Sequence, residues 1–147
     1  PSEMGAAFGV VQLNKLDHNI TEREKNFAEM SEFFKQYEEY FVLPKQLPNS
    51  RTGWLALALT IRDSAPFKRT EMQIFLEKRN IQTRTVFTGN ILRQPGFKNV
   101  ECKRSSDGYA ESDKVMRGGM LLACHHGLTR EMIDYTKENI SSFMASI

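Results

Sequence analysis

The chain has 147 residues, enough for one domain with a single modest core, and 40% of them are apolar. Twenty basic and 18 acidic residues leave a net charge of +2 without a long run of one sign, which disfavours nucleic-acid or membrane-surface binding. The longest apolar run, Trp54 to Leu59, is too short to span a bilayer, and the two cysteines make no disulfide framework. We therefore expect a cytoplasmic protein. Because the chain opens at Pro1 without an initiator Met, we also expect it to be a piece of a longer one.

The first predicted helix, Met4 to Leu16, is apolar nearly all round. One face carries Met4, Ala7, Phe8 and Val11, and a second carries Ala6, Val10 and Leu13. A helix of this kind is normally buried on several sides. We expect it to expose apolar surface that only a larger domain or a partner subunit covers, so that the isolated chain self-associates.

A second helix is predicted to start near Thr21, because Thr21 and Glu24 have the spacing of a capping box. Its inner stripe at helical spacing is Phe27, Met30, Phe34 and Tyr37. Pro44, Pro48 and Asn49-Ser50 indicate a linker after it.

The next elements alternate between strand and helix. Trp54 to Ile61 is short, apolar and flanked by turn residues, which favours a buried strand over a helix. A helix follows from Arg69 to Arg79, with Asn80 as its left-handed C-cap. Ile81 to Phe87 is rich in β-branched and aromatic residues and is predicted to be the second strand.

A long loop is predicted from Thr88 to Gly108, and loops of this length in a small domain are usually functional or mobile. A short helix from Ser112 to Gly118-Gly119 precedes a third strand, Met120 to Cys124. Gly127 and Thr129 open the last helix, whose inner face is Ile133, Thr136, Ile140 and Phe143. The sum is a small α+β domain of about three strands with packed helices.

Few residues have the spacing of a chemical site. Cys124-His125-His126 could be metal ligands or a nucleophile with its base, but adjacent strand residues point to opposite faces, so a structural role is favoured and no metal site is predicted. Cys102 is expected to be an exposed or half-exposed thiol.

Arg84 lies inside the second predicted strand, where a charged side chain most often faces solvent. The loop after it adds Asn90, Arg93 and Gln94, donors that suit an anionic or hydroxyl-rich ligand.

The order of segments resembles a known family. Glu3 to Leu16 is similar to a helix of the DegT/DnrJ/StrS sugar aminotransferases, in which a carboxylate and an apolar residue precede Gln-Ala-Ala and then Gly-x-x-Gln-Leu-x-x-Leu. Gly5 stands where that family normally has the first Gln. Ile81 to Arg84 and Gly127 to Thr129 also resemble the family.

One branch of the family is more similar than the others. Ala65-Pro66-Phe67 with Arg69, Ile81 to Arg84, and Gly89 to Lys98 resemble the CDP-4-dehydro-6-deoxyglucose 3-dehydrases. Ordinary sugar aminotransferases have Pro-Leu-His-Leu where this chain has Gly89-Asn90-Ile91-Leu92.

The resemblance implies the C-terminal small domain of a fold-type I PLP-dependent transferase, with connecting helices over 1–48 and the small α+β domain over 49–147. It implies a homodimeric parent enzyme of deoxysugar or lipopolysaccharide biosynthesis that uses PLP or PMP, and in some members a [2Fe–2S] cluster with a reductase partner. These groups lie upstream of this chain in the family pattern. No catalytic, cofactor-binding or metal residue is therefore expected here, and the chain alone should be inactive and should not bind PLP or PMP.

The nucleotide-sugar substrate is expected to contact Arg84, Asn90, Arg93 and Gln94. Two alternatives stay open: a sugar aminotransferase of the same family, and a stand-alone, non-catalytic interaction module that keeps the small-domain fold.

Overall fold

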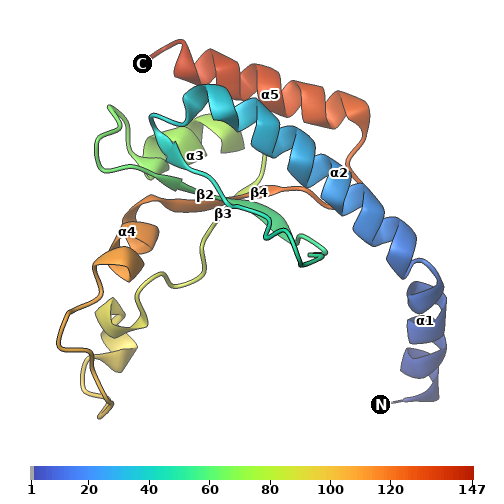
Figure 1. Ribbon diagram of the computed structural model, residues 1–147, viewed down its shortest axis with the longest axis horizontal. Helices are drawn as coiled ribbons and strands as arrows, with labels where there is room; N and C mark the ends of the chain where they lie inside the picture. The colour runs from blue at the N-terminus through green and yellow to red at the C-terminus, as the bar shows by residue number, and fades with distance from the viewer. Residues whose placement is uncertain (1) are drawn as a thin grey trace.

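A computed structural model describes residues 2–147 and shows an α+β domain with a four-stranded antiparallel sheet (Figure 1). The strand order is β1-β2-β4-β3. The α-helices and strands of this range are α1 (Glu3–Asn14), α2 (Leu16–Phe34), β1 (Phe41–Val42), β2 (Ala56–Ile61), α3 (Arg69–Glu77), β3 (Thr83–Thr85), α4 (Ala110–Gly118), β4 (Gly119–Ala123) and α5 (Arg130–Met144). Three short 3-10 helices join them, η1 (Lys35–Tyr37), η2 (Ile91–Arg93) and η3 (Pro95–Phe97).

The core lies on one face of the sheet. In β2, Leu57, Leu59 and Ile61 are buried while the residues between them are only half-buried, the alternation expected of a sheet with one well-covered face. The register places Leu57 opposite Leu122 and Leu59 opposite Met120 of β4. These inward side chains form a continuous apolar layer beneath the helices.

Helices α2 and α5 run side by side over this layer, with α3 beside them (Figure 1). The core residues that these two helices contribute are Phe27, Met30, Phe34, Ile133, Ile140 and Phe143. Glu29 of α2 pairs with both Arg130 and Lys137 of α5 on the outer side of the contact. The core of the small domain thus includes residues of α2, which lie before position 48. The division of the chain into connecting helices over 1–48 and a small domain over 49–147 stays a prediction.

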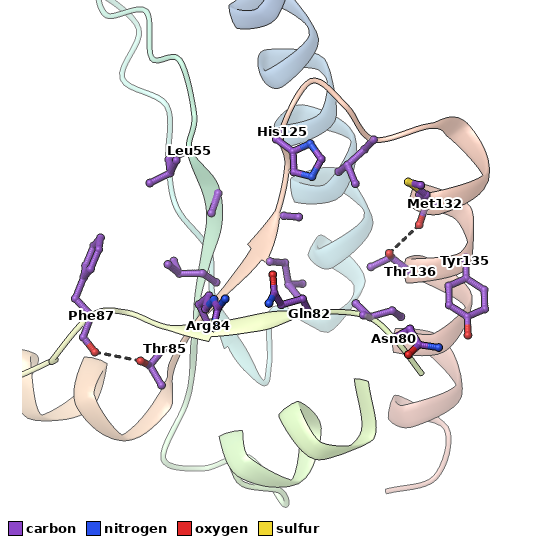
Figure 2. Close-up of a pocket in the computed structure, with 16 residues that line it drawn as sticks. Leu55, Asn80, Gln82, Arg84, Thr85, Phe87, His125, Met132, Tyr135 and Thr136 are labelled. Atoms are coloured by element: carbon purple, nitrogen blue, oxygen red, sulfur yellow. Dashed lines mark hydrogen bonds between the residues drawn. The ribbon is translucent and has the colours of Figure 1, made fainter. Parts of the chain in front are cut away.

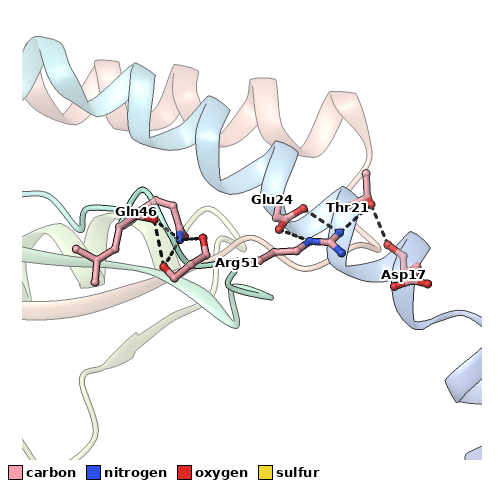
Figure 3. A network of polar contacts seen from close by, with 7 residues as sticks. Asp17, Thr21, Glu24, Gln46 and Arg51 are labelled. Carbon is pink, nitrogen blue, oxygen red and sulfur yellow. Dashed lines mark hydrogen bonds and ion pairs between the residues drawn. The ribbon is translucent and has the colours of Figure 1, made fainter.

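The predicted start of the second helix at Thr21 is wrong. Helix α2 begins at Leu16 after a break at Lys15, and no capping box forms at Thr21. Neither Gly nor Pro separates Leu16 from Thr21, so the helix extends through this segment and the Thr21 hydroxyl donates to the Asp17 carbonyl at 2.9 Å. Glu24 instead accepts hydrogen bonds from Arg51 at 2.9 and 3.2 Å, which ties the linker to α2 (Figure 3).

The predicted strand count of about three misses β1. In this two-residue strand Phe41 pairs with Ile61 of β2, and the Phe41 side chain is fully buried in the core. A two-residue element has no periodicity to detect, since its structure depends on pairing with β2 rather than on its own sequence.

Other predicted bounds also change. The strand predicted from Ile81 to Phe87 shortens to β3, and α4 begins at Ala110 rather than Ser112. The left-handed conformation predicted for Asn80 is confirmed at φ 59°.

Helix α1 extends away from the body of the domain, with the N-terminus at its far end (Figure 1). None of its residues is buried, and its exposed large side chains are Met4, Phe8, Val10, Val11 and Leu13. The predicted exposure of apolar surface on this helix is confirmed. Among residues 2–147, no helix combines the length and the apolar character needed to cross a membrane.

Candidate functional site

A groove of about 660 Å³ lies beside the edge strand β3, between the sheet and the start of α5 (Figure 2). It is lined by Leu55, Ala56, Asn80, Ile81, Gln82, Arg84, Thr85, Phe87, Leu121, Leu122, Ala123, His125, Leu128, Met132, Tyr135 and Thr136. Most of these side chains are apolar, and Arg84 is the one permanent charge among them. A largely apolar groove with a few polar groups is the usual form of a small-molecule site.

Strand alternation directs Arg84 into this groove. Thr83 faces the core, so the next residue of β3 points to the opposite face of the sheet. Glu77 fixes Thr83 by accepting hydrogen bonds from its N–H at 2.6 Å and its hydroxyl at 3.0 Å, and these bonds lower the pKa of Glu77. The register sets Arg84 opposite Leu121, which also lines the groove. Within residues 2–147 its guanidinium makes no hydrogen bond or ion pair, although its charge also contributes to the lowered pKa of Glu77. The side chain is exposed, so an anion can reach it.

The next two predicted binding residues, Asn90 and Arg93, are held by the protein itself. Asn90 is only 4% exposed, and its amide group donates to Asp113 at 2.7 Å while its carbonyl oxygen accepts from the Leu92 N–H at 3.1 Å. Arg93 donates to the same carboxylate at 3.1 and 2.9 Å. We call Asn90, Arg93 and Asp113 the loop latch, because these contacts fasten the loop after β3 to α4.

Gln94 also has an internal partner, since its amide group donates to the Thr88 carbonyl at 2.9 Å. It lines a smaller cavity of about 300 Å³ together with Arg69 and Met116. The structure therefore brings Asn90 and Arg93 together but does not place them, or Gln94, among the residues that line the groove with Arg84. A direct substrate contact by these three residues stays a prediction.

Apart from Arg84, the residues that line the groove were not identified from the sequence as site residues, and they include Gln82, Phe87 and His125. Gln82 directly precedes β3 and His125 lies two residues beyond β4, positions where the sequence pattern gives no reason to prefer them. The His125 Nδ1 accepts from the N–H of Gly127, a near neighbour, at 3.1 Å. Its backbone depends on a distant contact, because its carbonyl accepts from the Asn26 amide at 2.9 Å. Contacts that bridge about a hundred positions leave no local signal.

The cysteines and histidines show no sign of a reactive or metal-binding cluster. Cys124 is buried against the Trp54 carbonyl, and burial raises the pKa of its thiol to about 11, so the thiol stays protonated at neutral pH. Cys102 is exposed, as predicted. No group of three or more His, Cys, Asp and Glu residues within 2–147 is placed to hold a metal ion.

The loop latch should survive mild acid. Hydrogen bonds from Arg93 and then Asn90 lower the pKa of Asp113 from 3.8 to about 2. Because the folded pKa is the lower one, the stabilisation is complete above pH 3.8 and disappears as the pH falls through about 2. We expect the carbon-13 resonance of the Asp113 carboxyl group to titrate with a midpoint near 2.

Two variants separate the causes of this shift. Arg93→Gln should move the Asp113 midpoint well toward 3.8, whereas Arg117→Gln should move it little, because Arg117 acts on Asp113 only through its charge. A wild-type midpoint already near 3.8 would contradict the latch.

Comparisons with known proteins agree on one family. The pattern of the DegT/DnrJ/EryC1/StrS aminotransferase family matches residues 2–141. The chain is 35% identical over 144 residues to dTDP-4-dehydro-2,6-dideoxy-D-glucose 3-dehydratase of Saccharopolyspora spinosa, covering 98% of this chain and 31% of that protein. It is 28% identical over 142 residues to the lipopolysaccharide biosynthesis protein RfbH of Salmonella typhimurium, covering 97% of this chain and 32% of that protein.

Solved structures show the same fold. The GDP-4-keto-6-deoxy-D-mannose-3-dehydratase of E. coli with bound hydrated PLP matches with a TM-score of 0.84 and 23% identity, over 95% of this chain and 35% of that one. An aminotransferase from Psychrobacter cryohalolentis matches with a TM-score of 0.86 and 17% identity, over 99% and 39%. The chain thus spans about a third of the length of the relatives that it matches.

Proposed function

Because the chain belongs to the DegT/DnrJ/EryC1/StrS aminotransferase family, we propose that it is the C-terminal small domain of an enzyme that removes the 3-hydroxyl of a nucleotide-linked 4-keto sugar. The observation that carries this proposal is the similarity to a named 3-dehydratase at 35% identity over nearly the whole chain. Within that enzyme, the domain forms the sugar-nucleotide side of the active site. The parent is a cytoplasmic homodimer of deoxysugar or lipopolysaccharide biosynthesis.

The cofactor has its site elsewhere in the parent. Neither a lysine nor a carboxylate lines the groove, so its residues do not fit pyridoxal phosphate, which needs a group to hold its aldehyde carbon and an acid beside its ring nitrogen. We assign PLP or PMP, and a [2Fe–2S] cluster with its reductase if the parent uses one, to the rest of that protein, because the resemblance places these groups upstream of this chain.

Arg84 binds the diphosphate of the substrate. A guanidinium can donate two parallel hydrogen bonds to one phosphate, and the groove that Arg84 lines is otherwise largely apolar. The loop latch supports this arrangement indirectly, by holding the loop that follows β3 against α4. The named relatives act on dTDP- and GDP-linked sugars, and the CDP-linked substrate is our proposal from the branch that the sequence resembles.

Arg84→Lys tests this role in the parent enzyme. Lysine keeps the charge but cannot form the paired hydrogen bonds, so kcat/KM should fall by roughly ten- to a hundredfold, equivalent to about 1.5–3 kcal/mol. The measurement is turnover of the nucleotide-linked 4-keto sugar. Arg62→Lys is the matched control, because Arg62 donates to the Glu38 carbonyl at 3.1 Å and does not line the groove.

The same assay tests the proposed function. Wild-type efficiency in Arg84→Lys would remove Arg84 from substrate binding. Transfer of an amino group to the sugar, without loss of the 3-hydroxyl, would favour the aminotransferase alternative. A folded parent protein without either activity would favour the non-catalytic module.

A further inference from the structure

Phe87 is an exposed aromatic residue in an unusual backbone conformation. It has a φ of 45°, which bulky side chains rarely adopt, and 77% of its surface is exposed. An exposed phenylalanine gains nothing from burial, and a left-handed φ adds an energetic cost. Such a combination persists only when the surrounding structure imposes it, and it is concentrated at functional sites.

A packed turn imposes this conformation. The Phe87 N–H donates to the Thr85 carbonyl at 2.8 Å, and the Thr85 hydroxyl donates to the Phe87 carbonyl at 3.1 Å. Two residues later, Gly89 has a φ of 63° and lies so close to α4 that a Cβ on it would be 2.4 Å from the Cβ of Met116. The turn is therefore wedged against α4, and the ring of Phe87 is held out from the protein.

The ring borders the same groove as Arg84. Figure 2 shows Phe87 at one end of the groove, Arg84 nearer its middle, and Leu55 above them. An aromatic face, an apolar wall and a cation with no partner in residues 2–147 thus meet in one concave surface. A cation among apolar walls favours an anionic ligand, and an exposed ring beside it favours a ligand that also has a planar face.

We propose that Phe87 is the platform on which the nucleobase of the substrate stacks while Arg84 holds the diphosphate. The ligand class is a nucleoside diphosphate, which combines a planar base with anionic oxygens. The identification rests on the proposed function, since the nucleotide is the carrier of the sugar. Stacking on an aromatic ring tolerates every base, so Phe87 distinguishes nucleotide-linked sugars from simple sugar phosphates rather than one nucleotide from another.

Calorimetric binding of CDP, GDP and dTDP to the parent protein tests this inference. Phe87→Ala should raise each Kd by roughly five- to 150-fold, the range expected for one base on one aromatic ring. Phe87→Trp should bind as tightly as the wild type. Phe87→Leu should resemble Phe87→Ala, because it keeps apolar bulk without a planar face. Inorganic pyrophosphate should show no difference between any variant and the wild type.

A second exposed side chain of the same loop serves as the control. Val100→Ala removes another exposed apolar side chain of the same loop, outside the groove, and should change no Kd. Absence of nucleoside diphosphate binding in the wild type, an unchanged Kd in Phe87→Ala, or full affinity in Phe87→Leu would each overturn the stacking role. Turnover distinguishes the two proposals. If the protein binds nucleoside diphosphates through Phe87 but does not turn over the sugar, only the proposed dehydratase function is contradicted. If it turns over the sugar and Phe87→Ala leaves KM unaltered, only the stacking role of Phe87 is contradicted.

Discussion

Replacing Phe34 with Ala is expected to lower the free energy of unfolding by about 3–5 kcal/mol. The side chain is 0% exposed at the end of α2, and its ring contacts Phe41 of β1 edge-to-face at 5.2 Å between centroids. Truncation therefore leaves a cavity where α2 meets the sheet edge, and it removes an aromatic pair. Since a domain of this size is stable by only about 5–15 kcal/mol, the change is a large fraction of the total.

Urea unfolding followed by circular dichroism measures this loss, with the m-value as a check that the same transition is compared. Phe87→Ala is the matched control, because it makes the same truncation at a side chain that is 77% exposed, and it should change stability by less than about 0.5 kcal/mol. Equal losses in the two variants would show that α2 does not pack on the sheet as described.

Gly118→Ala is expected to cost about 2–3 kcal/mol, the second largest effect. A Cβ at this position would lie 2.3 Å from the backbone oxygen of Ile61 and 3.1 Å from its nitrogen. Ile61 is the last residue of β2 and pairs with Phe41, so its backbone cannot retreat without loss of the β1–β2 contact. The close approach of α4 to β2 thus requires glycine here.

Gly9→Ala provides the comparison for this variant. Apart from the neighbouring residues and the backbone of α1 itself, no atom lies within 4 Å of a Cβ built at Gly9. Alanine favours a helix over glycine, so the change should be neutral or should stabilise α1 by up to about 1 kcal/mol. Thermal unfolding of both variants gives the ordering. A Gly118→Ala protein as stable as Gly9→Ala would contradict the packing of α4 against β2.

The candidate site was only partly predictable. Arg84 drew attention from the sequence because a charge inside a predicted strand is a local feature, and its role as a binding residue stays a prediction. The loop latch could not, since it requires Asp113, which lies 20 positions beyond Arg93 and belongs to a helix with its own pattern. Asn90 and Arg93 do act as hydrogen-bond donors, but the group that accepts from them is the Asp113 carboxylate of the protein itself.

The family, the position of most helices and strands, and the exposed apolar character of α1 could be predicted from the amino-acid order, because they depend on hydrophobic periodicity and motifs within neighbouring residues. The strand Phe41–Val42 and the position of Phe87 at the groove follow instead from contacts made in the folded chain. Phe41 is ordered by its pairing with Ile61, and Phe87 by a turn wedged against Met116. In both cases the deciding contact is made by a residue 20 or more positions away, and local propensity contains no information about where the fold places that residue.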